Sequence, residues 1–438
     1  SHPGTAPGAE GGGLNELQIG ALILGVTLVV LFSGLPIAWG LTLVAVAFLW
    51  LFKGPAALAN VPILMMDELA SFALLTIPLF VLLGAAIGAS AAGKDIYESL
   101  HRWLDRVPGG LVIANILACG VFSAICGSSP ATAAAIGKAG VPEMIKRGVP
   151  PALATGSICA GGTLGILIPP SITMILYGLV TETSIGRLFL AGVVPGLLLV
   201  ALFSAYAWIA TLLAQRAAQR AAPQVEAPAR YTLKQKVEGL GRVSPFLGIV
   251  IAIGYAMYGG LATPSEVAAL SAVLALVLVV VIYRQWRLAD QWRIFRETVR
   301  ESSMILMIIG AAAVFSYMLS LLYVTQSAAQ WLVDLQMNRW VLLAAINVFL
   351  LVAGCFLPPV AIILMVMPIL TPVLEAASFD LIWFAVILTI NMEVGLITPP
   401  VGLNLYVLKG VAPDVPLPTV LKGSMPFVLL MILAMVLI

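Results

Sequence analysis

The stretches GGTLGILIPP at 161–170 and NMEVGLITPP at 391–400 decide the fold of this chain. Each lies inside an apolar segment and ends in a proline pair, Pro169-Pro170 in the first and Pro399-Pro400 in the second. Gly165 and Gly395 precede the pairs at the same offset. Because proline removes a backbone donor and disfavours helix in the residue before it, each stretch predicts a broken helix.

A second pair of motifs keeps the same spacing. Gly-Ser-Ser-Pro at 127–130 and Leu-Pro-Pro-Val at 357–360 are separated by the same interval as the two proline pairs. They interrupt the stretches 109–145 and 340–375, which are too long for one helix, so we expect two re-entrant helical hairpins. Unwound backbone is tolerated at bilayer depth only where protein or a cavity surrounds it. Paired interruptions in two repeats therefore predict a transporter with its site at the breaks.

Composition places the whole chain in a membrane. Of 438 residues, 61% are hydrophobic and 10% are charged, and long apolar runs recur. We expect an all-α polytopic membrane protein in a lipid bilayer, built from two inverted-topology repeats at 14–214 and 244–438, with a connector at 215–243. Residues 1–13 resemble a tag or linker. The net charge of +2 and the scattered basic residues give no sign of a nucleic-acid partner.

The apolar stretches also predict individual spans. They lie near 17–33, 36–52, 70–91, 109–145, 150–180 and 187–214 in the first half, and near 244–259, 262–283, 301–324, 340–375, 381–408 and 424–438 in the second. Only twelve residues follow Pro426, which is short for a span, so we expect a partner surface or further residues to complete it.

The distribution of charged residues distinguishes between two possible membrane topologies. With the N-terminus outside and the connector in the cytoplasm, only Lys53, Arg187 and Arg339 of the 22 Lys and Arg face outward. The other 19 are cytoplasmic, as the positive-inside rule requires. If each hairpin stretch is counted as two full spans instead, the segments after the first hairpin fall on sides of the membrane that disagree with this rule. The basic segment 284–301 predicts an amphipathic helix in the cytoplasmic interface, and Thr263 to Glu266 predicts a capping box.

Polar residues inside the membrane gather at the breaks. Freed carbonyls and hydroxyls suit Na⁺, whereas helix N-termini and N–H groups suit an anion. We expect the substrate near Ser129, Thr132, Pro169, Pro170, Ser171, Thr173, Pro399, Pro400 and Asn404. Taken singly, such small and hydroxyl-bearing residues are ordinary helix-packing material. The only histidines are His2 and His101, the second expected on a solvated face, so a histidine-based enzyme centre is not expected.

Glu393 is the one acidic residue well inside a predicted span. An intramembrane carboxylate is a functional candidate by default. Its alternative role is structural, as a cap for N–H groups freed at the break. The sequence leaves both roles open.

Three runs resemble one known family: FSAICGSSPATAAAIGKAGVPEMIKRG at 122–148, ATGSICAGGTLGILIPPSITMILYG at 154–178 and NMEVGLITPPVGLNLYVLKG at 391–410. They are similar to the large membrane subunit of tripartite ATP-independent periplasmic (TRAP) transporters. The resemblance implies an elevator-type, sodium-driven importer in the bacterial inner membrane, with a transport domain at about 109–180 and 340–408. It also implies a small membrane subunit (Q) and a periplasmic substrate-binding protein (P).

The family resemblance also implies substrates and ion ligands. The substrates would be small organic anions such as C4-dicarboxylates, 2-oxo acids or sialic acid. The implied ligands for the cotransported Na⁺ are Ser123, Gly127, Ser128, Gly161, Thr163 and Gly165 at one site and Gly354, Cys355, Asn391 and Thr398 at the other.

Three other functions compete with this one. A stand-alone ion-coupled anion transporter would share the architecture but need no binding protein. A cation/proton antiporter would carry intramembrane acidic pairs, whereas Glu393 stands nearly alone. A channel would carry a repeated pore ring, and the two hairpins are unlike in sequence.

Overall fold

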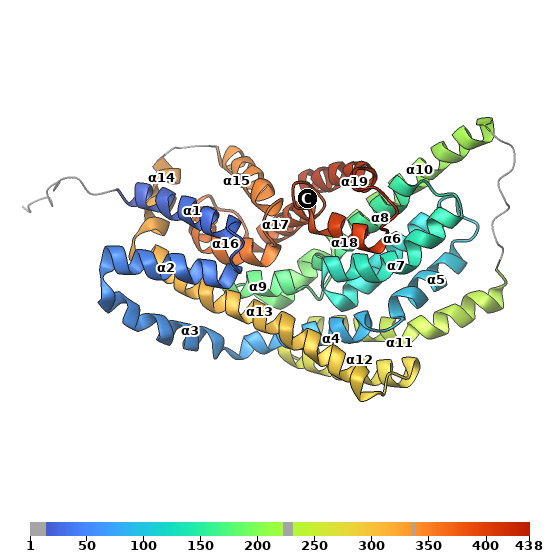
Figure 1. Ribbon diagram of the computed structural model, residues 1–438, viewed down its shortest axis with the longest axis horizontal. Coiled ribbons are helices and arrows are strands. Elements are labelled where there is room, and N and C mark those ends of the chain that lie inside the picture. The colour runs from blue at the N-terminus through green and yellow to red at the C-terminus, as the bar shows by residue number, and fades with distance from the viewer. Residues whose placement is uncertain (1–14, 222–230, 335–337) are drawn as a thin grey trace, which may run out of the picture.

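A computed structural model describes residues 15–221, 231–334 and 338–438, and every regular element within them is a helix (Figure 1). The first half contains α1 (Glu16–Phe32), α2 (Ile37–Lys53), η1 (Pro55–Asn60), α3 (Val61–Leu69), η2 (Phe72–Leu75), α4 (Thr76–Gly88), α5 (Ala92–Trp103), α6 (Gly110–Cys126), α7 (Ser129–Lys146), α8 (Pro151–Thr163), η3 (Leu164–Ile166), α9 (Ile172–Val180) and α10 (Ile185–Ala221). The second contains α11 (Leu233–Tyr258), α12 (Pro264–Tyr283), α13 (Leu288–Leu321), α14 (Val324–Asp334), α15 (Arg339–Gly354), α16 (Pro359–Ala376), α17 (Leu381–Leu396), α18 (Leu403–Val411) and α19 (Leu417–Leu437).

The helices repeat with the same offset as the proline motifs. Adding 230 to the residue numbers of α7 gives both ends of α16, and adding it to the first residue of α8 gives the first residue of α17. The pairs α2/α12, α5/α14, α6/α15 and α9/α18 keep the offset to within a few positions. The spacing read from two proline pairs therefore extends over most of the chain.

Two groups of helices pack against each other. One contains α2, α3, α4, α12 and α13, with α13 lying along α2, α3 and α4 and α12 packed on α4 (Figure 1). The other contains the two interrupted pairs, α6–α9 and α15–α18, joined by α10 and α19. α5 contacts α6 and α7 of the second group and α4 of the first, so it links the groups.

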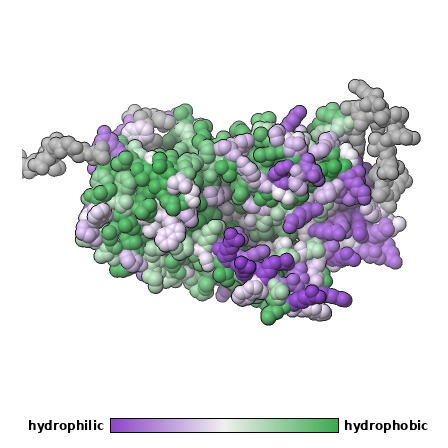
Figure 2. Space-filling view, in the orientation of Figure 1, coloured by the Kyte–Doolittle hydropathy of each residue, from purple (hydrophilic) through white to green (hydrophobic). Residues whose placement is uncertain are grey.

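The surface and the helix lengths agree with a membrane environment. By length and composition, six of the described helices could cross a membrane, or seven if one bent pair counts as a span. Hydrophobic side chains cover much of the face in Figure 2, and hydrophilic ones gather toward the end where α5 and α11 lie. The chain is an integral membrane protein.

The third segment of each half differs from the prediction. The span expected at 70–91 is preceded by a further helical segment, and Pro55–Leu69 and Phe72–Gly88 meet at a bend of 57°. The bend falls where Ser71 is extended, with ψ 125°. In the second half, the prediction of a separate interface helix at 284–301 was wrong. From Leu288 onward these residues form the start of α13, which continues without a break to Leu321.

The last helix also corrects the sequence analysis. α19 begins at Leu417, before the expected stretch at 424–438, and its 21 residues are long and apolar enough to cross a membrane. Pro426 lies inside the helix and does not start it. The expectation that this segment is too short for a span was therefore wrong.

Two further predictions can be compared with the helix ends. The capping box at the start of α12 is confirmed. The side chain of Glu266 accepts a hydrogen bond from the backbone N–H of Thr263, and the hydroxyl of Thr263 accepts one from the backbone N–H of Glu266. α10 and α11 extend into both ends of the polar connector. Residues 1–13 and 222–230 lie outside the described part of the chain.

Candidate functional site

The first hairpin turns back on itself between α6 and α7, and its tip rests on the first break. Gly127 has a φ of +64°, which an L side chain rarely adopts, and it lets the chain reverse within two residues. A Cβ on Gly127 would lie 2.7 Å from the carbonyl oxygen of Pro170. A Cβ on Gly165 would lie 2.7 Å from the carbonyl oxygen of Ser128. Glycine at both positions allows the two backbones to meet.

Hydroxyl groups surround this contact. The Ser123 and Thr132 hydroxyl oxygens are 3.5 Å apart, and Thr132 donates to the carbonyl oxygen of Ser128 at 2.9 Å. Ser171 donates to the carbonyl oxygen of Ile166 and caps the start of α9. Thr173, close behind it on α9, is buried. The structure thus brings most of the predicted first-half residues to one place.

Gly161 and Thr163 point elsewhere. A Cβ on Gly161 would lie 2.9 Å from the sulfur of Cys119, in the middle of α6. The Thr163 hydroxyl donates to the carbonyl oxygen of Ala160 at 2.6 Å and lies 3.8 Å from the sulfur of Met431 on α19. The side chain of Thr163 therefore faces away from the hairpin tip.

The second hairpin tip rests on the second break in a related way. A Cβ on Gly395 would lie 2.5 Å from the carbonyl carbon of Gly354. The Val401 N–H donates to the carbonyl oxygen of Cys355 at 3.2 Å, so a backbone hydrogen bond joins the tip to the break. Thr398, just beyond the end of α17, donates to the carbonyl oxygen of Val394 in that helix.

Asn391 connects the broken helix α17 to α15, the first helix of the second hairpin. Its amide nitrogen donates to the backbone oxygen and to the Oδ1 of Asn347, at 2.9 and 3.0 Å. Its own Oδ1 is buried and has no hydrogen-bond partner among the described residues. A buried acceptor of this kind is suited to a cation or a water molecule.

Asn404 joins the two halves. From α18 it donates to the Ser129 hydroxyl at 2.8 Å and to the carbonyl oxygen of Cys159 at 3.3 Å. Its Oδ1 is also buried without a partner in the described parts of the chain. The predicted substrate residues Ser129 and Asn404 are thus in contact, although 275 positions separate them.

A cavity of about 630 Å³ reaches the first hairpin tip. Its lining includes Cys126 and Ser128 at the tip and Ile172 at the start of α9. Five charged side chains also line it, three basic and two acidic: Lys94, Lys138, Arg293, Glu297 and Glu301. The cavity therefore connects the hairpin tip to charged positions on α5, α7 and α13.

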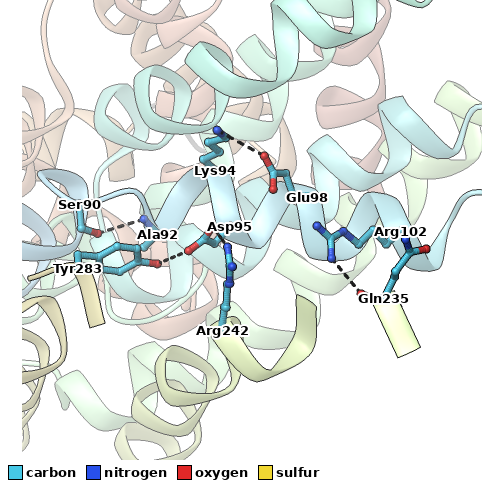
Figure 3. A network of polar contacts seen from close by, with 9 residues as sticks. All are labelled: Ser90, Ala92, Lys94, Asp95, Glu98, Arg102, Gln235, Arg242 and Tyr283. Carbon is cyan, nitrogen blue, oxygen red and sulfur yellow. Dashed lines mark hydrogen bonds and ion pairs between the residues drawn. The ribbon is translucent and has the colours of Figure 1, made fainter. Parts of the chain in front are cut away.

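Polar contacts fix α5 beside this cavity (Figure 3). Asp95 accepts a hydrogen bond from the Tyr283 hydroxyl at 2.8 Å and lies 3.9 Å from the Arg242 guanidinium. Arg102 donates to the carbonyl oxygen of Gln235 at 3.0 Å. α5 is thereby tied to α11 and α12 along one side.

His101 corrects an expectation. It was predicted on a solvated face, but only 8% of it is exposed. Its Nε2 lies 3.1 Å from the Arg147 guanidinium at the end of the first hairpin, and its ring stacks on Tyr97. The reason is that α5, which bears the charges, also packs against α6 and α7.

Sequence reasoning missed some residues of the site. Asn347 was hidden in the apolar stretch 340–375, although an amide there is itself a signal. Gly84 was also missed: a Cβ on it would lie 2.7 Å from the carbonyl oxygen of Cys126, so α4 approaches the tip closely. Arg293, Glu297 and Glu301 were assigned to an interface helix.

Comparison with known proteins supports the same family. Residues 24–438 match the family model described as "Tripartite ATP-independent periplasmic transporter, DctM component". The chain is 35% identical over 388 residues to the C4-dicarboxylate TRAP transporter large permease protein DctM of Pseudomonas aeruginosa, covering 89% of this chain and 88% of that protein. It is 31% identical to the sialic acid TRAP transporter large permease protein SiaM of Vibrio cholerae, covering 93% of each.

A solved structure shares the fold. The Alcanivorax borkumensis YdaH transporter superposes with a TM-score of 0.61 at 18% identity, covering 87% of this chain and 88% of that one. The family model, the permease relatives and the pair of interrupted helical hairpins agree. The chain belongs to the DctM component family of tripartite ATP-independent periplasmic (TRAP) transporters.

Proposed function

We propose that this chain is the membrane subunit of a sodium-driven importer of small organic anions. The observation that carries the proposal is the meeting of each hairpin tip with the helix break of its own half. Gly165 lies against Ser128, and Gly395 lies against Gly354. Such breaks expose carbonyl oxygens and N–H groups without fixed charge, which suits Na⁺ and a carboxylate respectively.

The cotransported Na⁺ would bind at the two tips. The hydroxyls of Ser123 and Thr132 and the carbonyl oxygen of Ser128 supply oxygen atoms at the first tip. The unpartnered Oδ1 of Asn391 supplies one near the second. Oxygen ligands of this kind suit a hard monovalent cation.

The substrate would lie where α18 crosses the first hairpin. Ser129 and Asn404 meet there, and the cavity beside Ser128 carries three basic and two acidic side chains. C4-dicarboxylate and sialic acid relatives support a carboxylate as the cargo. Hydroxyl, amide and N–H groups would then hold the carboxylate.

Transport by an elevator movement is supported by packing within the second group of helices. A Cβ on Gly423 of α19 would lie 1.8 Å from the carbonyl oxygen of Ala152 on α8, and one on Gly156 would lie 2.2 Å from Gly423 itself. Close backbone contact ties α8 to α19, so the hairpins, the broken helices and α19 would shift together against α2, α12 and α13.

A small membrane subunit (Q) and a periplasmic substrate-binding protein (P) would complete the transporter in the bacterial inner membrane. The family description names a tripartite system, and the relatives are large permeases. The N-terminus would be periplasmic and the connector cytoplasmic, as the distribution of Lys and Arg requires. An alternative is a stand-alone sodium-coupled carrier with the same site.

The test is uptake into proteoliposomes containing this chain and the small subunit. An inward Na⁺ gradient is imposed, labelled C4-dicarboxylate, 2-oxo acid and sialic acid are compared, and the binding protein is added or omitted. Uptake that requires both Na⁺ and the binding protein is the expected result. Uptake with Na⁺ alone would establish the stand-alone carrier, and uptake indifferent to Na⁺ would contradict the proposal.

A further inference from the structure

The helix α13 is longer than the apolar layer of a membrane is thick. Its 34 residues span about 50 Å at 1.5 Å per residue, whereas the hydrocarbon layer of a bilayer is about 30 Å thick. Every charged residue of α13 precedes Ser302, and the remainder is apolar or carries only small polar groups and one tyrosine. The excess length is therefore at the N-terminal end, and these turns extend from the hydrocarbon into the headgroup layer.

Three arginines follow one line along these turns. Arg293, Arg296 and Arg300 are spaced by three and four residues, so they share one face of the helix, and all three are exposed. We call them the arginine line. The same spacing continues to Met304 and Met307, whose side chains are 56% and 41% exposed. One line of the helix surface thus changes from arginine to methionine within about one turn, as expected where headgroups give way to hydrocarbon.

An apolar stripe lies beside the arginine line. Leu288, Trp292, Phe295 and Val299 are spaced by four, three and four residues, and each is between 43% and 86% exposed. Tryptophan is enriched where a membrane meets water. A helix with an arginine-rich face next to exposed Trp, Phe and Leu has the pattern of a helix that lies among headgroups.

The arginine line is available for a ligand. None of its three guanidinium groups forms an ion pair with another residue in the described part of the chain. Glu297 and Glu301 lie on the next face of the helix, where they line the cavity below the first hairpin tip together with Arg293. The arginine line therefore separates the apolar stripe from a water-accessible cavity. A guanidinium in such a position can donate two hydrogen bonds to one phosphate.

The first repeat shows that the fold does not require arginine at these positions. Subtracting 230 from the residue numbers of the arginine line gives Ile63, Met66 and Ala70, in α3 and directly after it. Ile63 and Met66 are also exposed, at 59% and 69%. The same exposed line is therefore apolar in one repeat and basic in the other, so the basic charge has a role of its own on α13.

We propose that the arginine line and the apolar stripe of α13 form a binding site for an anionic phospholipid. The guanidinium groups would donate to the phosphate oxygens, and the acyl chains would lie along the apolar stripe. Charge complementarity favours this occupant, because a helix of another protein packed on this face would have to bury three unpaired positive charges. The site goes beyond the proposed transport function and does not depend on it.

The first test uses the unaltered chain. The protein is purified in detergent, depleted of lipid, and unfolded by heat with added phosphatidylglycerol or phosphatidylcholine. Phosphatidylglycerol should raise the unfolding temperature by at least about 3 °C more than phosphatidylcholine, because a ligand of the folded state stabilises it. About 1 M NaCl should remove at least half of that difference by screening the charges. Equal effects of the two lipids would overturn the proposal.

The second test removes the arginine line. The triple variant Arg293→Gln, Arg296→Gln and Arg300→Gln should bind fluorescent phosphatidylglycerol at least about tenfold more weakly than the wild type. The matched control is Lys53→Gln, Arg187→Gln and Arg339→Gln, which removes the same charge from exposed positions elsewhere and should bind as the wild type does. Wild-type affinity in the first variant, or an equal loss in both, would contradict the site.

The third test identifies what covers the apolar stripe in a membrane. A photoreactive amino acid replaces Trp292, and the chain is irradiated in bacterial membranes that also contain the small membrane subunit. Crosslinked phospholipid is the expected product. A product with the small subunit and none with lipid would show that the apolar stripe is a protein interface, and would refute the lipid site while leaving the proposed importer standing.

Discussion

The two proline breaks share a sequence pattern and a register, and both pairs contain a cis peptide bond, but they differ in burial. Pro170 is buried and Pro169 is half-buried, whereas Pro399 and Pro400 are both exposed. The first break lies under other helices. The second lies at the surface, held to its hairpin tip by the hydrogen bond from Val401 to Cys355.

The covering helix explains the difference. α10 crosses the first break with glycines: a Cβ on Gly192 would lie 2.5 Å from the carbonyl oxygen of Leu167, and one on Gly196 would lie 2.8 Å from the Ile168 side chain. The equivalent positions of the second repeat, on α19, are Lys422 and Pro426. Their bulk prevents the same close approach, and α19 packs through Gly423 on α8 instead. One break is therefore fixed by packing, and the other remains accessible.

The largest expected effect comes from forcing the first break away from its tip. Gly165→Val places a side chain where the Ser128 carbonyl now lies, so the tip must move, at a cost of about 1–3 kcal/mol. We expect uptake to fall at least about tenfold. Proteoliposome uptake and thermal unfolding of the purified protein would measure both effects.

The control for this change is Gly120→Ala on α6, where the nearest side-chain atom would lie at an ordinary 3.5 Å. It should leave uptake and stability near those of the wild type. Wild-type uptake by Gly165→Val would show that the contact between tip and break is dispensable.

The next effect concerns the cavity that the first tip faces. Ser128→Trp fills space beside the tip, so it should abolish substrate uptake and leave the folded protein intact. Val194→Trp adds the same bulk on an exposed apolar face of α10 and is the control. Normal uptake by Ser128→Trp would remove Ser128 from the transport path.

A smaller effect should separate the two breaks directly. Replacing Pro169 and Pro170 with alanine removes packed atoms and should lower the free energy of unfolding by about 1–3 kcal/mol. Replacing the exposed Pro399 and Pro400 should lower it by less than about 1 kcal/mol. Both variants should weaken the Na⁺ dependence of uptake, because the breaks present the oxygen ligands. Equal destabilisation by the two double variants would contradict the difference in burial.

The sequence predicted these local interruptions but not how the halves pack. Proline and glycine restrict the backbone locally, so the broken helices, the hairpins and the Thr263 cap could be read in advance. The contacts of Asn347 with Asn391 and of Asn404 with Ser129 could not. These contacts join residues tens to hundreds of positions apart. The spacing of polar residues within one segment does not show which distant residue each of them meets.

The smallest effect tests a further asymmetry, at the far ends of the hairpins. The first hairpin ends at Arg147 beside His101, whereas the second begins with Arg339 over Trp340 and Phe379, which do not titrate. Burial, and next the Arg147 charge, lower the pKa of His101 to about 4. An unfolded histidine has a pKa of about 6.5, so the unfolded chain binds more protons between about pH 6.5 and about pH 4.

Stability should therefore fall as the pH drops through that window, by about 1–2 kcal/mol, a value reduced for the solvent access of the ring. His101→Gln cannot take up this proton, so its unfolding temperature should depend less on pH than that of the wild type. Equal slopes for the two proteins would show that the junction of α5 with the first hairpin does not respond to acid. A shallower slope for the variant would locate the acid sensitivity at the end of the first hairpin far from its tip.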